Sequence, residues 1–183
     1  MYYISKITFD NSVALARRLA NVHDNLHAMV WWLFPNDLTN KPHVVYSIVN
    51  NEVYVVSSIP TRPAGGLNVQ CKEYDPNFIN GMAFNFDATV NPVKTNNGKR
   101  FAILKYDELL EWMQRQGSNN GFSLLDFSER GHHKYIVNGE PMFGVNLSGV
   151  LQVNDPDKFK HVVLNGIGKA KAYGMGLLRI TRI

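Results

Sequence analysis

Hydrophobic and polar residues alternate along several short stretches in the first half of the chain, as they do in strands with one buried face. This pattern predicts strands over residues 2–9, 43–49, 52–58 and 81–91. Apolar residues at helical spacing predict helices over residues 13–20 and 25–34. Strand, helix, strand, strand and a later strand is the order of a ferredoxin-like domain, which we assign to residues 1–91.

The second half of the chain repeats this order with weaker signals. Strands are predicted over residues 99–105, 122–127, 134–137, 142–153 and 176–183. Helices are predicted over residues 107–116 and 155–165. The order indicates a second ferredoxin-like domain over residues 92–183, and for the whole chain an α+β fold of tandem ferredoxin-like (RRM-like) domains. Neither half carries the aromatic signature with which conventional RNA-recognition motifs stack bases.

A glycine-rich stretch joins the last predicted helix to the last predicted strand. Residues 166–178 read Gly-Ile-Gly-Lys-Ala-Lys-Ala-Tyr-Gly-Met-Gly-Leu-Leu. Glycine permits positive φ and a close approach to a ligand, and Lys169 and Lys171 place charge beside exposed amides, which suits a phosphate. The spacing fits neither the dinucleotide fingerprint nor the P-loop, because Lys171 takes the third glycine position and Ala170 follows Lys169. A helix C-cap followed by a glycine-rich turn is an equally acceptable interpretation.

Composition narrows the class of protein. The chain has 183 residues, is 45% hydrophobic and carries a net charge of +4, so it is long enough for one folded domain or two small ones. Its charge is unevenly distributed, since no Asp or Glu follows Asp157. Between Asp87 and Asp107 the only charged residues are Lys94, Lys99, Arg100 and Lys105. Two basic stretches without acids indicate a phosphate-facing surface, although a solvated face would explain either stretch alone.

The remaining global signals concern the compartment. Cys71 is the only cysteine, so no internal disulfide forms and a reducing compartment fits. The first ten residues alternate too early for a signal peptide, and no apolar run approaches the roughly 18 residues of a membrane span. We therefore expect a cytoplasmic protein without a membrane partner.

Histidines are the candidate chemical groups. His27 lies beside the apolar stripe of its predicted helix, which is consistent with a side chain that faces a cleft. A half-buried histidine with a satisfied hydrogen bond is the alternative that the residues alone favour. His23 and His27 have a spacing that places two imidazoles on one helical face, but Asp24 stands where the metalloprotease pattern has Glu and no third ligand is evident. We expect no metal site and no cofactor.

Four blocks of sequence resemble one family. The pattern Gly-Ile-Gly-x-x-Lys-x-x-Gly-x-Gly-Leu-Leu near the C-terminus resembles the signature of the CRISPR RNA-processing endoribonucleases, most closely the CasE family of the Cascade complex. Residues 26–35 are similar to that family's Leu-His-x-x-x-Trp-x-Leu-Phe-Pro. Residues 91–100 resemble its Asn-Pro-x-Lys-Thr with a downstream Lys-Arg pair, and residues 143–151 resemble its Phe-x-Gly-x-Leu run. Residues 60–80 and 117–140 carry no match.

The resemblance implies a function. It implies metal-independent cleavage of a CRISPR repeat RNA hairpin, leaving 2′,3′-cyclic phosphate and 5′-hydroxyl ends, by a Cascade subunit of antiviral defence. His27 would be catalytic. The residues that would bind RNA are Lys94, Lys99, Arg100, Lys169, Lys171 and, on a weaker match, Arg17. The family usually has a tyrosine three residues before the histidine, where this chain has Asp24. That departure leaves a second interpretation open, a catalytically impaired relative that binds an RNA hairpin.

Overall fold

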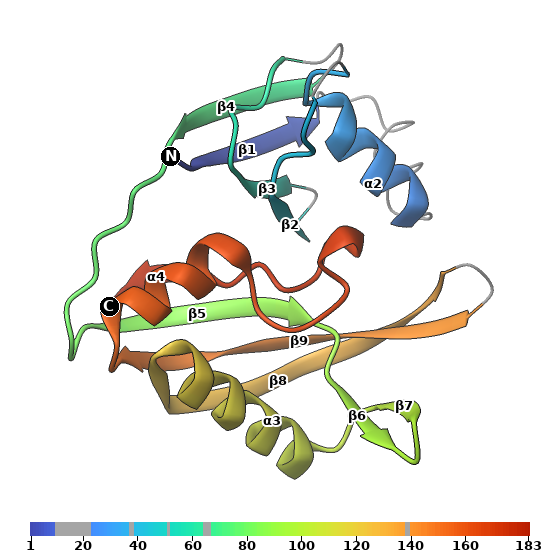
Figure 1. Ribbon diagram of the computed structural model, residues 1–183. Coiled ribbons are helices and arrows are strands. Elements are labelled where there is room, and N and C mark those ends of the chain that lie inside the picture. The colour runs from blue at the N-terminus through green and yellow to red at the C-terminus, as the bar shows by residue number, and fades with distance from the viewer. Residues whose placement is uncertain (10–22, 37–38, 51, 64–66, 138–139) are drawn as a thin grey trace.

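Two four-stranded antiparallel sheets form the framework of the protein (Figure 1). The computed structural model describes residues 1–9, 23–36, 39–50, 52–63, 67–137 and 140–183. The helix that we predict over residues 13–20, with Arg17, lies outside the described residues. Within the described residues, no helix has the length and apolar character that crossing a bilayer requires.

The first sheet has the strand order β2-β3-β1-β4. Its strands are β1 (Tyr3–Phe9), β2 (Val44–Val49), β3 (Glu52–Ser57) and β4 (Leu67–Glu73). Alternation along β1 and β3 puts Ile7 opposite Val53, and both are fully buried against helix α2 (His23–Trp32). The strands that we predict over residues 2–9, 43–49 and 52–58 are confirmed, with ends that differ by one residue.

The fourth strand of this sheet corrects one of our expectations. Residues 81–91 do contain a strand, β5 (Ala83–Val90), but it pairs with β9 in the second sheet and not with the first. The first sheet ends instead with β4, in a stretch without any predicted strand. No residue of β4 is buried and its last four residues are exposed, as is common for a strand at a sheet edge, so the strand gives little periodic signal in the sequence. The chain therefore changes sheets within residues 74–82, and we place the boundary of the two domains there, not at residue 91.

The second sheet has the order β10-β5-β9-β8. Its other strands are β8 (Phe122–Val137), β9 (Glu140–Val153) and β10 (Arg179–Arg182). When the strands of each sheet are numbered within their own domain, the second sheet has the order 4-1-3-2, and the first sheet has the same order when it is read from its other edge. This is the ferredoxin-like strand order. Helices α3 (Tyr106–Asn120) and α4 (Pro156–Asn165) pack into the core of this sheet. The α+β tandem ferredoxin-like fold is therefore confirmed.

Two predictions in the second half need correction. The two short strands expected over residues 122–127 and 134–137 are parts of the one strand β8, which is irregular opposite β9 between Glu129 and His132. The strand expected over residues 99–105 is shorter than predicted: β7 covers Lys99–Ala102 only. It pairs with β6 (Val93–Asn96) and the two strands form a hairpin. Asn97 and Gly98 turn this hairpin with φ of 48° and 75°, the conformation that Asn-Gly favours.

The two domains pack against each other through α4, which lies between the sheets (Figure 1). Val45 and Val56, on the face of the first sheet turned away from α2, are buried with Leu164 of α4 and with Leu177. The guanidinium of Arg179 lies over the Tyr54 ring, 5.1 Å from its centroid. Side chains from one domain therefore have fixed neighbours in the other, which allows a site to be shared between them.

Candidate active site

The glycine-rich stretch forms a tight turn at the end of β5. A single 3₁₀ turn, η1 (Lys171–Tyr173), stands between Ala170 and Gly174, whose φ values of 62° and 77° are both left-handed. The Gly176 N–H donates to the Thr89 carbonyl at 2.6 Å, and Lys169 forms an isolated β-bridge with Asn91. The loop is thus attached by its backbone to the start of the β6–β7 segment.

Three of the four sequence blocks meet at this turn. The Asn91 side-chain amide donates to the Phe143 carbonyl at 2.8 Å, which joins the Asn-Pro block to the Phe-Gly block of β9. A Cβ on Gly144 would lie 3.2 Å from the Met175 side chain, so β9 also approaches the glycine-rich turn closely. Asn91 therefore has a structural role here, as it connects segments that bear the turn.

The fourth block places His27 on the same turn. Its Nδ1 lies 2.8 Å from the carbonyl oxygen of Ala172, and the Tyr46 hydroxyl donates to that oxygen at 2.6 Å. A carbonyl oxygen can only accept, so the hydrogen in this bond belongs to Nδ1. The His27 ring also meets the Trp31 ring edge-on, with centroids 5.9 Å apart. Met29 is buried whereas His27 is half-buried, in keeping with a histidine beside the apolar stripe.

The predicted cations fall into two groups. Lys169 and Lys171 lie on the turn that contacts His27; Lys169 is exposed, and partial burial lowers the pKa of Lys171. Lys94, Lys99 and Arg100 lie exposed on the β6–β7 hairpin. This hairpin follows the C-terminal end of β5, the same end at which the glycine-rich turn lies (Figure 1). The Lys94 ammonium is 2.7 Å from a carboxylate oxygen of Glu108, and the bond lowers the pKa of that carboxyl.

The part of the chain that the structure describes gives no side-chain contact with this site for two residues named in the sequence analysis, Arg17 and Asp24. Arg17 lies outside the described residues. Asp24 belongs to the first turn of α2, one helical turn before His27, so the helix places it on the same side at backbone level. The departure from the family's tyrosine therefore falls next to the candidate catalytic group.

Sequence reasoning missed Tyr46 and His43. Tyr46 is 2% exposed and reads as an ordinary core position of β2, so no local pattern marks its hydroxyl contact. His43 precedes β2 and meets the Tyr2 ring edge-on at 6.2 Å. Its Nε2 is buried without a hydrogen-bond partner among the described residues. Burial lowers the pKa of His43, and the charge of Lys171 and nearby His161 act in the same direction, while the Leu164 backbone opposes them.

The lowered pKa of His43 predicts how stability depends on pH. Because the folded state disfavours the imidazolium, the unfolded chain binds more protons as the pH falls through about 6.5. We expect full stability above that pH and a falling melting temperature between about pH 6.5 and 5. His43→Phe keeps an aromatic ring against Tyr2 and should flatten this dependence, measured as melting temperature from pH 5 to 8. Parallel curves for the two proteins would contradict the assignment.

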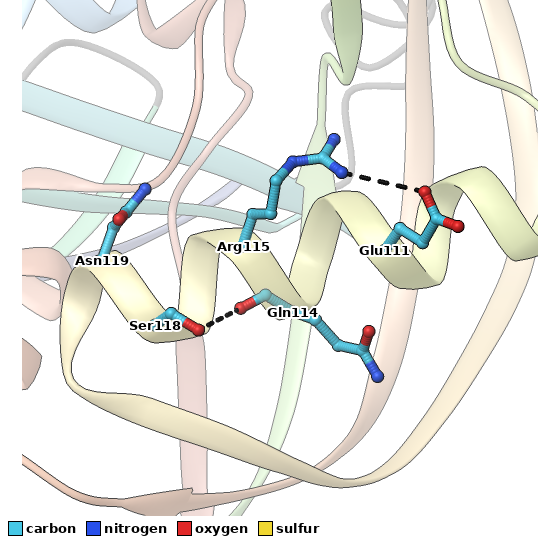
Figure 2. A pocket seen from close by; sticks show the side chains of 5 residues that line it. All are labelled: Glu111, Gln114, Arg115, Ser118 and Asn119. Atoms are coloured by element: carbon cyan, nitrogen blue, oxygen red, sulfur yellow. Dashed lines mark hydrogen bonds and ion pairs between the residues drawn. The ribbon is translucent and has the colours of Figure 1, made fainter.

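A hollow on α3 is not part of this site. It measures about 430 Å³ and is lined by one helix alone, with Arg115 and Glu111 3.9 Å apart on its wall (Figure 2). Its lining includes no residue of the glycine-rich turn or of α2. Nor do three or more His, Cys, Asp or Glu side chains gather anywhere in the described part of the chain in a way that would hold a metal ion.

Comparisons with known proteins give a consistent result. Residues 2–182 match the family model described as CRISPR associated protein. The chain is 25% identical to the CRISPR system Cascade subunit CasE of Escherichia coli over 207 aligned positions, which cover 97% of this chain and 98% of that protein. It is 30% identical to the CRISPR-associated endoribonuclease Cse3 of Thermus thermophilus over 128 positions, 60% of each chain. A solved Cse3 endoribonuclease bound to a 19-nucleotide RNA superposes with a TM-score of 0.88 at 22% identity, covering 99% of this chain and 100% of that one. The matches confirm the resemblance drawn from the four blocks.

Proposed function

Because the chain belongs to the family of CRISPR-associated proteins, we propose that it is a metal-independent endoribonuclease that binds and cuts a CRISPR repeat RNA hairpin. One observation carries the proposal: His27 is bonded to the same turn that bears Lys169 and Lys171. A group able to transfer protons near neutral pH therefore lies beside cations that attract phosphate.

The reaction that fits these groups is an internal transfer at phosphorus. The 2′-oxygen attacks the adjacent phosphate as its proton passes to an acceptor, the bond from phosphorus to the 5′-oxygen breaks, and that oxygen takes up a proton. The products are a 2′,3′-cyclic phosphate and a 5′-hydroxyl, and no water is consumed. A positioned histidine typically contributes 10²–10⁴-fold to such proton transfers. The lysines stabilise the charge that develops on the phosphorane oxygens.

RNA binding is expected to run through two surfaces. One is the glycine-rich turn with Lys169 and Lys171, and the other is the β6–β7 hairpin with Lys99 and Arg100. The similarity to a Cascade subunit and to an RNA-bound Cse3 supports an RNA hairpin and Cascade proteins as the partners of this chain. Arg17 and Lys94 stay predictions as RNA contacts, the second in competition with Glu108.

The lysines of the turn can be tested through salt dependence. Each lost phosphate contact should flatten the slope of log K against log salt by about 0.7–0.9. Lys169→Ala with Lys171→Ala should therefore weaken hairpin binding and flatten the slope together, measured by fluorescence anisotropy from low to moderate salt. Lys41→Ala with Lys72→Ala removes the same charge from exposed positions outside both basic stretches and should leave the slope unchanged. An unaltered slope in the first variant would show that the turn does not contact phosphate.

The function itself is tested with a labelled repeat hairpin. Cleavage in the presence of EDTA, resolved on a denaturing gel, should continue, and a 2′-deoxy nucleotide at the scissile position should stop it. Cutting of the deoxy substrate would contradict the mechanism.

The second candidate, an RNA-hairpin binder that does not cut, is favoured by Asp24, since a carboxylate beside His27 would repel the anionic phosphorane where a tyrosine would donate a hydrogen bond. The endoribonuclease proposal expects Asp24→Tyr to speed cleavage. Tight binding with no cleavage by either protein would establish the binder.

A further inference from the structure

The carbonyl of Ala172 accepts hydrogen bonds from two side chains of the other domain. The His27 bond measures 2.8 Å and the Tyr46 bond 2.6 Å, and the donors come from α2 and β2. We propose that Tyr46 is a positioning residue: by bonding this carbonyl it keeps the oxygen directed at His27 and leaves Nε2 as the nitrogen that exchanges a proton with RNA. The proposal rests on the endoribonuclease function proposed above.

The shared acceptor selects one form of the imidazole. A neutral histidine carries its hydrogen on Nδ1 or on Nε2, and the bond made by one nitrogen decides the state of the other. Because the carbonyl has no hydrogen to give, the form with hydrogen on Nε2 alone would place two lone pairs against each other at 2.8 Å. The neutral ring therefore keeps Nε2 as an acceptor. When the ring is protonated, Nδ1 still bonds the carbonyl, so Nε2 is the nitrogen left to give or take a proton in both directions of transfer.

Tyr46 is suited to direct the carbonyl because it cannot move or lose its hydrogen easily. Its side chain is 2% exposed and packs with Ile7, Val53 and Val55 in the core of the first domain. Burial raises the pKa of its hydroxyl well above the ordinary range, with Tyr173 acting in the same direction. The hydroxyl is therefore a donor at every working pH, and a buried donor strongly prefers to keep its acceptor.

The carbonyl itself needs this second donor. Ala172 is exposed, in the middle of a single 3₁₀ turn whose flanking residues, Ala170 and Gly174, hold left-handed φ values. So short a turn has few internal hydrogen bonds to fix its peptide planes. With the Tyr46 hydroxyl removed, the peptide is free to tilt, and His27 then samples both neutral forms.

The experiment compares wild type with Tyr46→Phe, which keeps the buried ring and removes only the hydroxyl. Nitrogen-15 NMR of the histidine rings, with His27 assigned through His27→Gln, reports which ring nitrogen carries the hydrogen. We expect Nδ1–H in the wild type and a mixture in Tyr46→Phe. Single-turnover cleavage of a bound hairpin should fall about tenfold, the size expected for one hydrogen bond, while affinity stays within about twofold. Tyr54→Phe, which removes a hydroxyl bonded to Glu52, is the matched control and should match the wild type in both readouts.

The outcomes separate this proposal from the function on which it rests. An Nε2–H form in the wild-type spectrum overturns the proposal whether or not the protein cuts RNA. This readout needs only the wild type, so it remains decisive even if Tyr46→Phe fails to fold. Unchanged ring form and rate in folded Tyr46→Phe overturn the role of Tyr46 and leave the endoribonuclease proposal intact. An uncut hairpin together with the expected spectra supports the positioning by Tyr46 and removes the endoribonuclease proposal.

Discussion

His27→Ala is expected to lower single-turnover cleavage of a bound repeat hairpin by at least about a hundredfold, while hairpin affinity stays within a few-fold. The reason is that the imidazole is the only group bonded to the glycine-rich turn that transfers protons readily near neutral pH, among those the structure describes. The affinity survives because the phosphate contacts are assigned to lysines and Arg100, which the substitution does not touch.

The measurement is a rate with enzyme in excess, paired with an anisotropy titration on an uncleavable 2′-deoxy hairpin. His161→Ala is the matched control, because it removes an exposed histidine of α4 whose ring is bonded to Asn165 of the same helix. It should cut at the wild-type rate. If His27→Ala loses affinity as much as it loses rate, His27 is a binding residue, and the proton-transfer role is wrong.

Gly176→Ala is expected to have the second largest effect. A Cβ at this position would lie 2.4 Å from the carbonyl oxygen of Ile167, and φ is +89°. The Gly176 carbonyl accepts from the Ile167 N–H at 2.7 Å, so the two strands of the loop cannot separate without breaking that bond. The turn that carries Ala172 must shift, and a misplacement of about 1 Å costs on the order of a hundredfold in rate.

Gly81→Ala is the control that separates the effect of the Cβ contact at Gly176 from the effect of a left-handed backbone. Gly81 has φ of +88°, and a Cβ there meets no atom within 4 Å. Gly81→Ala should therefore lower the free energy of unfolding by about 1–2 kcal/mol through its left-handed backbone alone and leave cleavage unchanged. Gly176→Ala should lower it by about 2 kcal/mol more and reduce cleavage about a hundredfold. Urea unfolding and single-turnover rates measure both quantities. Equal behaviour of the two variants would show that the loop tolerates displacement.

The sequence predicted elements wherever burial follows the local period. β1 and β3 each bury alternate residues, α2 buries Met29 and Val30, and Leu33 directly after the helix continues the apolar stripe, so all three elements were predictable. β4 is mostly exposed and gives almost no such signal. The sheet to which β5 belongs is decided by partners in β9 and β10, about 60 and 95 positions along the chain, and local periodicity holds no information on such pairing.

The candidate site divides in the same way. His27 and the glycine-rich turn carry sequence blocks that resemble a family, so they were found without a structure. Tyr46 belongs to no block, and its hydroxyl meets a backbone carbonyl 126 residues away. A backbone acceptor has no residue type to recognise, so contacts of this kind become visible only after the chain is folded.

The bond between His27 and Ala172 spans 145 residues of chain and crosses from one domain to the other. A chain emerging from the ribosome completes α2 long before the glycine-rich turn exists, so its imidazole has no oriented neighbour during most of synthesis. Contacts of such long range form late in folding, because the intervening chain must first be ordered. Under the endoribonuclease proposal, a half-made or misfolded copy would therefore lack its proton-transfer geometry, and cutting would be confined to molecules whose two domains have docked.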